Sequence, residues 1–238
     1  MIGSKNDDDG LALLVAQARG RDAHGILRLA LTESFPGRTA IVSSFGAESA
    51  VLLHLVAQVD PDAPVLFLNT GKLFGETLRY RDRLQVGLGL SDVRTLGPNG
   101  REAGSADPEG TLWSRDADAC CALRKVTPLR RAMAGFDAQV TGRKRFQTGM
   151  RANMELVEFF EGHYRFNPLA AWEPDDIKAY MTKHNLPVHP LTEDGYPSIG
   201  CQPCTRRVLP GEGMRAGRWA GLDKDECGIH TESDVGLR

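Results

Sequence analysis

The sequence predicts an α/β protein with a mostly parallel sheet flanked by helices and a flexible C-terminal tail. Two short β-type runs, residues 40–42 and 65–68, are each followed by a polar loop and then by a helical pattern. This alternation is typical of a parallel sheet covered by helices. Binding sites in such folds lie at the carboxyl ends of the strands, here at residues 43–49 and 69–72.

The other elements follow in chain order. Helices are expected at residues 11–32 (two segments separated near Gly20), 47–59, 76–84, 116–126, from Thr127 and Pro128 onward, and 173–183. A further strand is expected at 138–141. Residues 97–110 are rich in Gly, Pro and Asp and predict a surface connector or a mobile flap. From Pro187 onward the chain is turn-rich and is expected to drape over the sheet.

Charge and hydropathy exclude several classes of protein. The 238 residues carry 29 Lys plus Arg and 31 Asp plus Glu, a net charge of −2, which argues against a DNA- or RNA-binding protein. No apolar run approaches the roughly 18–20 residues that cross a bilayer. The N-terminus carries Asp7, Asp8 and Asp9 in place of an export signal. We therefore expect a cytoplasmic enzyme that binds neither nucleic acid nor membrane.

Five cysteines are the most informative residues. Cys120 and Cys121 form one tight pair, Cys201 and Cys204 form another, and Cys227 stands alone. This odd number does not indicate a disulfide framework. Thiolates suit zinc or iron–sulfur clusters, but zinc ligands usually come as two spaced pairs. Adjacent side chains diverge and reach two irons more readily than one ion, which favours one [4Fe–4S] cluster per chain; buried structural cysteines are the competing interpretation.

Two features predict an anion site. The loop at residues 43–49 lies between a strand and a helix, where free backbone N–H groups bind phosphate; a plain helix cap is the alternative. Three basic stretches accompany the cysteines: Arg124, Lys125, Arg130 and Arg131; Arg143, Lys144, Arg145 and Arg151; Arg206, Arg207, Arg215 and Arg218. If these stretches converge, they form a pocket for a small polyanion, because arginine recognises phosphate-like oxygens with paired donors.

Cys227 is the candidate nucleophile. It lies in the polar, glycine-containing segment 226–230, where an accessible thiol near a His or Arg supplies thiolate. An idle surface thiol is the alternative.

Together these motifs resemble the thioredoxin-dependent adenylyl-sulfate reductases of assimilatory sulfur metabolism, within the family that also reduces the 3′-phosphorylated substrate. The matching blocks are residues 43–49, 67–77, 120–129, 167–170, 195–206, 210–212, 215–219 and 226–230. The two cysteine pairs separate this branch from the cluster-free reductases. Three positions depart from the family pattern: Asn69 replaces an aspartate, Gly75 a proline and Lys144 an arginine.

The resemblance implies a fold of the adenine-nucleotide alpha-hydrolase-like, PP-loop type and an enzyme that reduces adenosine 5′-phosphosulfate (APS) to sulfite and AMP. Cys227 would attack the sulfur to give an S-sulfonate, which thioredoxin or glutaredoxin would release as sulfite. The adenosine is expected beside Ser43, Ser44, Phe45, Gly46, Ser49, Leu68, Asn69, Thr70 and Gly71. The phosphate and sulfate are expected at Lys125, Arg145, Arg215 and Arg218, with His230 tuning Cys227 or docking the reductant.

The expected organisation has three parts. Residues 1–37 form an N-terminal helical segment, 38–205 the nucleotide-binding and iron–sulfur domain, and 206–238 the substrate loop and mobile tail. Three other functions stay open: reduction of the 3′-phosphorylated substrate (PAPS), a zinc-stabilised nucleotide-binding module, and an RNA sulfur-insertion enzyme, which the lack of a separate basic domain disfavours. The sequence does not decide whether the chain forms a homo-oligomer.

Overall fold

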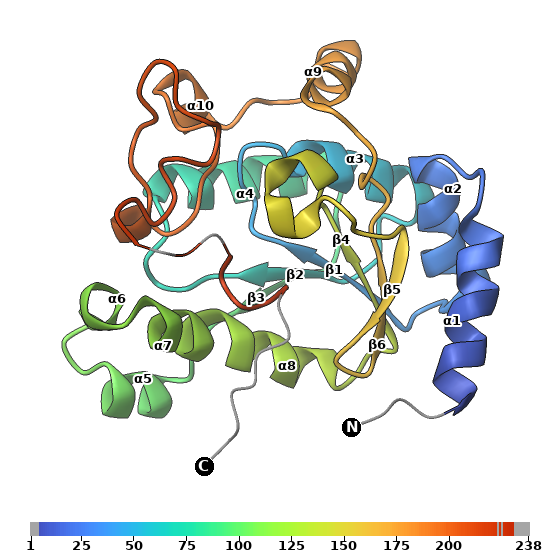
Figure 1. Ribbon diagram of the computed structural model, residues 1–238, viewed down its shortest axis with the longest axis horizontal. Coiled ribbons are helices and arrows are strands. Elements are labelled where there is room, and N and C mark those ends of the chain that lie inside the picture. The colour runs from blue at the N-terminus through green and yellow to red at the C-terminus, as the bar shows by residue number, and fades with distance from the viewer. Residues whose placement is uncertain (1–4, 223, 225, 231–238) are drawn as a thin grey trace.

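The computed structural model describes residues 5–222, 224 and 226–230, and it places a twisted sheet between layers of helices (Figure 1). The strands of this sheet run in the order β3-β2-β1-β4-β6-β5. All neighbours are parallel except β5 and β6, which confirms the predicted fold class. The strands are β1 (Thr39–Ser43), β2 (Val65–Leu68), β3 (Val93–Leu96), β4 (Ala138–Thr141), β5 (Val157–Phe160) and β6 (His163–Phe166).

The predicted helices are present. The described helices are α1 (Lys5–Ala18), α2 (Ala23–Arg28), α3 (Ser49–Val59), α4 (Gly75–Leu88), α5 (Gly100–Ala106), α6 (Leu112–Arg115), α7 (Ala117–Cys121), α8 (Thr127–Met133), α9 (Pro174–Lys183) and α10 (Pro190–Glu193), with π-helical turns at Leu29–Ser34 and Ala122–Val126. Gly20 separates α1 from α2 with φ +72°, a conformation that glycine adopts without a Cβ penalty.

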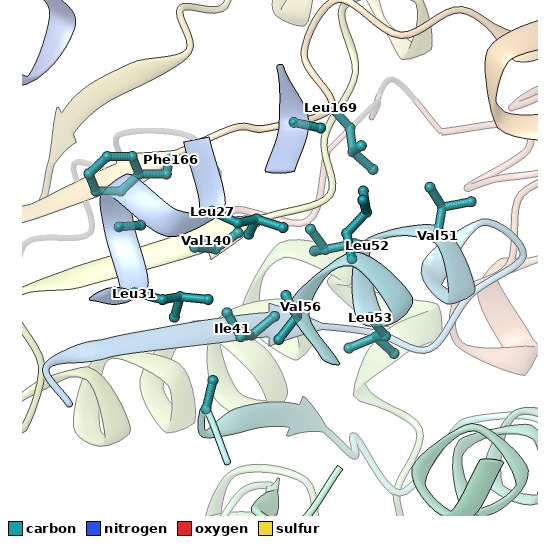
Figure 2. Packing of buried hydrophobic residues seen from close by; sticks show 14 of the residues in the cluster. Leu27, Leu31, Ile41, Val51, Leu52, Leu53, Val56, Val140, Phe166 and Leu169 are labelled. Carbon is teal, nitrogen blue, oxygen red and sulfur yellow. The ribbon is translucent and has the colours of Figure 1, made fainter. Parts of the chain in front are cut away.

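Side chains of the central strands alternate between two cores. Ile41 on β1 and Phe67 on β2 pack into the larger core, beneath α2, α3 and α4. Figure 2 shows Ile41 in this core beside Val56 of α3. Val42 and Leu66 point to the opposite face and pack against Leu129 and Met133 of α8. This two-residue period on a sheet buried on both sides explains the near-continuous apolar runs of β1 and β2.

Three features differ from the sequence-based expectation. Strand β3 and the β5–β6 hairpin were not predicted, because residues 93–96 are half exposed and residues 157–166 carry charges between their apolar positions. Residues 97–110 were expected to be a connector or flap, but they contain α5. The C-cap of α5 is Asp107, whose buried carboxylate accepts a 2.7 Å hydrogen bond from Arg124.

The chain after Pro187 drapes over the carboxyl edge of the sheet, as expected. Cys201 forms a bridge pair with Leu73, and the Gln202 amide donates to the Lys72 carbonyl at 2.7 Å. The last described segment, drawn in red in Figure 1, then returns to the sheet. The loop after β2, the segment around Cys201 and the last described segment therefore meet at one edge of the sheet.

The N-terminal helices share the larger core with the sheet: Leu14, Ile26 and Leu27 are buried in it. The expected domain boundaries stay a prediction. In the described part of the chain, no helix is both long and apolar enough to cross a membrane.

Candidate active site

A cavity of about 720 Å³ opens at the carboxyl ends of β1, β2 and β4. Its floor includes Ser43 from the end of β1, Leu68 from β2 and Thr141 from β4. The strand order reverses at β1, since the chain proceeds to β2 and β3 on one side and then returns to β4 on the other. A topological switch point of this kind is where open α/β sheets bind ligands.

The loop after β1 lines the cavity through most of its predicted residues: Ser43, Ser44, Gly46 and Ser49. Phe45 does not. It has φ 49° and a fully buried side chain that contacts the Phe67 ring edge-on, 5.2 Å between centroids. The backbone twist that turns this ring into the core leaves the small residues facing the cavity. Phe45 therefore shapes the loop from behind.

At the end of β2, Leu68 and Thr70 line the cavity, whereas Asn69 and Gly71 do not. The Asn69 side chain accepts a 3.0 Å hydrogen bond from the Gly71 amide, and Gly71 has φ +70°. Asn69 therefore stabilises the turn by a local side-chain bond that an aspartate would also make. Thr70 Oγ1 lies 3.2 Å from the Cys201 sulfur.

Cationic side chains dominate the cavity wall. Among the described residues, seven cationic and two acidic side chains line it: Lys125, Arg143, Lys144, Arg151, Arg215, Arg218 and Lys224, with Glu48 and Glu226. Members of all three predicted basic stretches therefore converge in a protein of net charge −2. Such a concave, cation-lined site focuses a positive potential on its contents.

Arg145 is a correction to the predicted anion-binding set. It does not line the cavity; its Nε donates a 2.8 Å hydrogen bond to the Met154 carbonyl. The chain turns into a 3-10 helix at Arg145 and directs its side chain to the neighbouring loop. Arg143 and Arg151, which belong to the same basic stretch but were not assigned, line the cavity instead.

Other members of the basic stretches form ion pairs outside the cavity. Arg130 pairs with Glu161 and Arg206 with Glu212, both with exposed arginine side chains. Inside the cavity, the Lys144 ammonium lies 2.6 Å from Glu48, so this departure from the family arginine serves a lysine–carboxylate pair between two loops. Arg143 lies 2.6 Å from Glu158.

Burial and neighbouring positive charges lower the pKa values of two cavity groups, Arg215 and His230. Burial, followed by the neighbouring Arg218, lowers the pKa of Arg215 to about 10. Burial also lowers the pKa of His230 well below its usual value, and Arg143 and Arg151 act in the same direction. The His230 imidazole is therefore neutral at physiological pH.

The four paired cysteines gather beside this cavity. Cys120, Cys121 and Cys201 are buried and Cys204 is half buried; all are free thiols. Burial raises the pKa of Cys121 to about 11, with Lys125 opposing and the Cys201 sulfur adding to the rise. Each member of the first pair interacts electrostatically with both members of the second. In the ranges that the structure describes, no three His, Cys, Asp or Glu side chains are grouped closely enough to hold a single metal ion.

Lys125 and Arg218 interact electrostatically both with these thiols and with Cys227. Burial opposes the charge on Lys125, but the sulfurs of Cys227, Cys201 and Cys121 outweigh it and raise the pKa of Lys125. Burial lowers the pKa of Arg218, and Cys227 is the largest opposing influence. The Arg218 guanidinium also lies 4.4 Å from the Trp219 ring centroid. Cys227, half buried, therefore lines the cationic cavity, as does Cys201 of the paired cysteines.

Fold and site together define a parallel α/β protein with a cationic anion pocket at its switch point and a free thiol in that pocket. The comparisons with known proteins agree. The family described as phosphoadenosine phosphosulfate reductase domain matches residues 38–207. The chain belongs to this family.

Two relatives are named adenosine 5′-phosphosulfate reductase. The protein from Mesorhizobium japonicum is 48% identical over 94% of this chain and 89% of its own, and that from Chelativorans sp. is 52% identical over 82% and 79%. The crystal structure of a phosphoadenylyl-sulfate reductase from Candida auris, a phosphate complex, superposes with a TM-score of 0.72. It covers 87% of this chain and 99% of that chain at 24% identity, which shows the shared fold.

Proposed function

We propose that this protein reduces APS to sulfite and AMP in assimilatory sulfate reduction, an oxidoreductase step toward cysteine biosynthesis. The observation that carries the proposal is the Cys227 thiol, which lines a cavity at the strand ends with seven cationic side chains among its described residues. Relatives 48% and 52% identical carry the name of this activity. An anionic substrate with an electrophilic sulfur fits both the charge and the nucleophile.

The chemistry proceeds in two transfers. The Cys227 thiolate attacks the sulfur of the bound sulfate group, a sulfur–sulfur bond forms, and the bond to the phosphate oxygen breaks. AMP leaves with that electron pair, and cations beside the phosphate stabilise the developing charge. A thiolate of a dithiol reductant then attacks the Cys227 sulfur and sulfite leaves; the second thiol resolves the mixed disulfide.

Thioredoxin or glutaredoxin is the reductant in this proposal. Cys227 is only half buried, and Glu226, Ile229 and His230 of the same segment also line the cavity. For the second transfer the Cys227 segment leaves the cavity, because a protein dithiol is too large to enter one of about 720 Å³.

The proposal includes one [4Fe–4S] cluster held by Cys120, Cys121, Cys201 and Cys204. The donor set fits, because each thiol of the first pair interacts electrostatically with both thiols of the second, and thiolates are the ligands of iron–sulfur clusters. When bound, the cluster supplies a compact centre that adjusts the electrostatics of the adjacent cavity. Lys125 and Arg218 interact with the cysteine thiols and also line the cavity proposed for the substrate.

The test is sulfite release from APS and, separately, from PAPS by the anaerobically prepared protein with reduced thioredoxin, together with iron, sulfide and zinc analysis. The expected result is turnover of APS, four irons and four sulfides. Preferential turnover of PAPS would replace the substrate, and one zinc per chain would exclude the cluster.

Cys227→Ser identifies the nucleophile. We expect this variant to lose sulfite release and S-sulfonate formation while it keeps the brown chromophore, because Cys227 is not among the cluster ligands. Normal sulfite release by Cys227→Ser would show that another group attacks the sulfur.

A further inference from the structure

Glu226, the residue before Cys227, is fastened to the cavity wall by a buried ion pair. The Arg151 Nη2 donates a 2.7 Å hydrogen bond to Glu226 Oε2, and Arg151 Nε lies 2.6 Å from Oε1. Thr148 adds a 3.4 Å hydrogen bond to the same carboxylate. Both Glu226 and Arg151 are 8% exposed. One charge-assisted hydrogen bond and one close ion-pair contact therefore fix the position of this carboxylate.

Charge makes this contact costly to break. Glu226 and Glu48 are the acidic members of the described cavity lining, and Glu48 is paired with Lys144 on the rigid wall. Glu226 is therefore the acidic lining group that belongs to the cysteine segment. Without Glu226, the buried Arg151 guanidinium has no counter-charge. The free-energy cost of removing one partner is far larger for a buried ion pair than for an exposed one.

Other contacts also hold this segment: the Lys224 ammonium lies 5.6 Å from the Trp219 ring centroid, and Arg165 donates a 3.5 Å hydrogen bond to the Ile229 carbonyl. Lys224 pairs with Asp118 of α7, but the Asp118 side chain is 83% exposed. Solvent screens such a pair, which contributes little. Ile229 is half buried against the smaller core, and it lies beyond Cys227 in the chain. Glu226 is the nearest anchor to the thiol.

We propose that Glu226 is a positioning residue: through Arg151 it holds Cys227 in the cavity for the attack on sulfur. The inference rests on the proposed function for its catalytic meaning, but the docking of the segment is testable without substrate. It also predicts a kinetic split. Loss of Glu226 slows S-sulfonate formation, whereas APS affinity does not fall, because the freed Arg151 adds a cation to the anion site.

The first measurement is the alkylation rate of Cys227 by iodoacetamide in the full-length protein, resolved by peptide mass spectrometry. Dividing the rate in denaturant by the rate in the native protein gives a protection factor that removes intrinsic thiol reactivity. We expect Glu226→Gln to lower this factor by roughly ten- to a hundredfold, the range for a hydrogen bond to a charged group.

Two variants separate position from charge. Glu226→Asp keeps the charge but shortens the side chain, so it should also lose most of the protection. The matched control Asp118→Asn removes the exposed ion pair of the same segment and should change the factor less than about threefold. Arg151→Gln combined with Glu226→Gln should lose no more protection than the worse single variant, because the two side chains act through each other.

The second measurement is the single-turnover rate of S-sulfonate formation from APS, alongside APS affinity measured in a Cys227→Ser background. We expect Glu226→Gln to lower the rate at least about tenfold, with affinity unchanged or tighter. Unchanged protection in Glu226→Gln, or protection in Glu226→Asp equal to that of the wild type, would overturn the positioning role. If Glu226→Gln loses protection but the wild type releases no sulfite from APS, the docking role is upheld and the proposed function is refuted.

Discussion

The protonation state of His189 is expected to control the stability of the contact between α10 and the segment that leads to Cys201. Its Nδ1 accepts a 3.2 Å hydrogen bond from the Leu191 amide at the start of α10, so the ring proton resides on Nε2, which donates to Thr77 Oγ1 at 3.1 Å. Leu191 packs with Phe74 and Ile199. Ile199 precedes Cys201 by two positions in the sequence. Protonation of His189 would place an N–H against the Leu191 N–H and loosen this contact.

The magnitude follows from its pKa. His189 is fully buried, and burial lowers its pKa from 6.5 to about 4 against a smaller opposing effect of Glu76. Between these values the unfolded chain binds a proton that the folded protein does not, so stability falls as pH falls below about 6.5. At about 1.36 kcal/mol per pH unit, acidification from pH 6.5 to pH 5 removes about 2 kcal/mol.

The perturbation is His189→Asn, which keeps an acceptor for the Leu191 amide but cannot bind the proton. We expect the variant to be less stable than the wild type at pH 7.5 and to recover about 2 kcal/mol relative to it by pH 5. Urea unfolding followed by circular dichroism at both pH values measures the difference. Leu191→Ala is the control, because it removes packing but no titrating group, and its deficit should not depend on pH. A pH-independent deficit for His189→Asn would refute the assigned tautomer and the lowered pKa.

Two further predictions concern buried cations. Arg218→Ala should weaken APS binding roughly ten- to a hundredfold, a far larger effect than its effect on the unfolding midpoint. Arg131→Ala, which alters an exposed ion pair, is the control, and unchanged APS affinity would contradict the role of Arg218. Asp107→Asn should lower the free energy of unfolding by about 3–5 kcal/mol, since it leaves the Arg124 guanidinium buried without its counter-charge. Glu102→Gln, at the exposed pair with Arg131, should cost less than about 1 kcal/mol, and an equally small loss for Asp107→Asn would contradict the assignment.

The central part of the fold was predictable because β1 and β2 are buried on both faces and therefore read as short apolar runs. The edge strands were not, since β3 and β5 are half exposed and their side chains show no apolar run. The hairpin of β5 and β6 depends on pairing with β4, a long-range contact that no local pattern announces. The local sequence pattern therefore predicts the fully buried central strands but not the half-exposed edge strands.

In the site, the strands and cysteine pairs could be placed from sequence, but side-chain direction could not. Phe45 and Arg145 both lie in the expected loops, yet one ring enters the core and one guanidinium turns to a neighbouring carbonyl. Arg151 was passed over because it is six residues further along the same basic stretch. Its place in the cavity depends on the 3-10 turn Gly149–Arg151 and on the carboxylate of Glu226, 75 residues away.

Arg143, Lys144 and Arg151 each form an ion pair with a carboxylate, so the charge of the cavity depends on whether these pairs are closed. Lys144 and Arg143 are compensated by carboxylates fixed on the wall, whereas Arg151 is compensated by Glu226, which travels with the nucleophile. Seating Cys227 therefore also satisfies a buried arginine. In the proposed mechanism, departure of the segment toward the reductant removes the Glu226 charge from the cavity and leaves a more cationic pocket. Opening of the Arg151–Glu226 pair would therefore both release Cys227 from the cavity and increase the attraction of the cavity for the next anionic substrate.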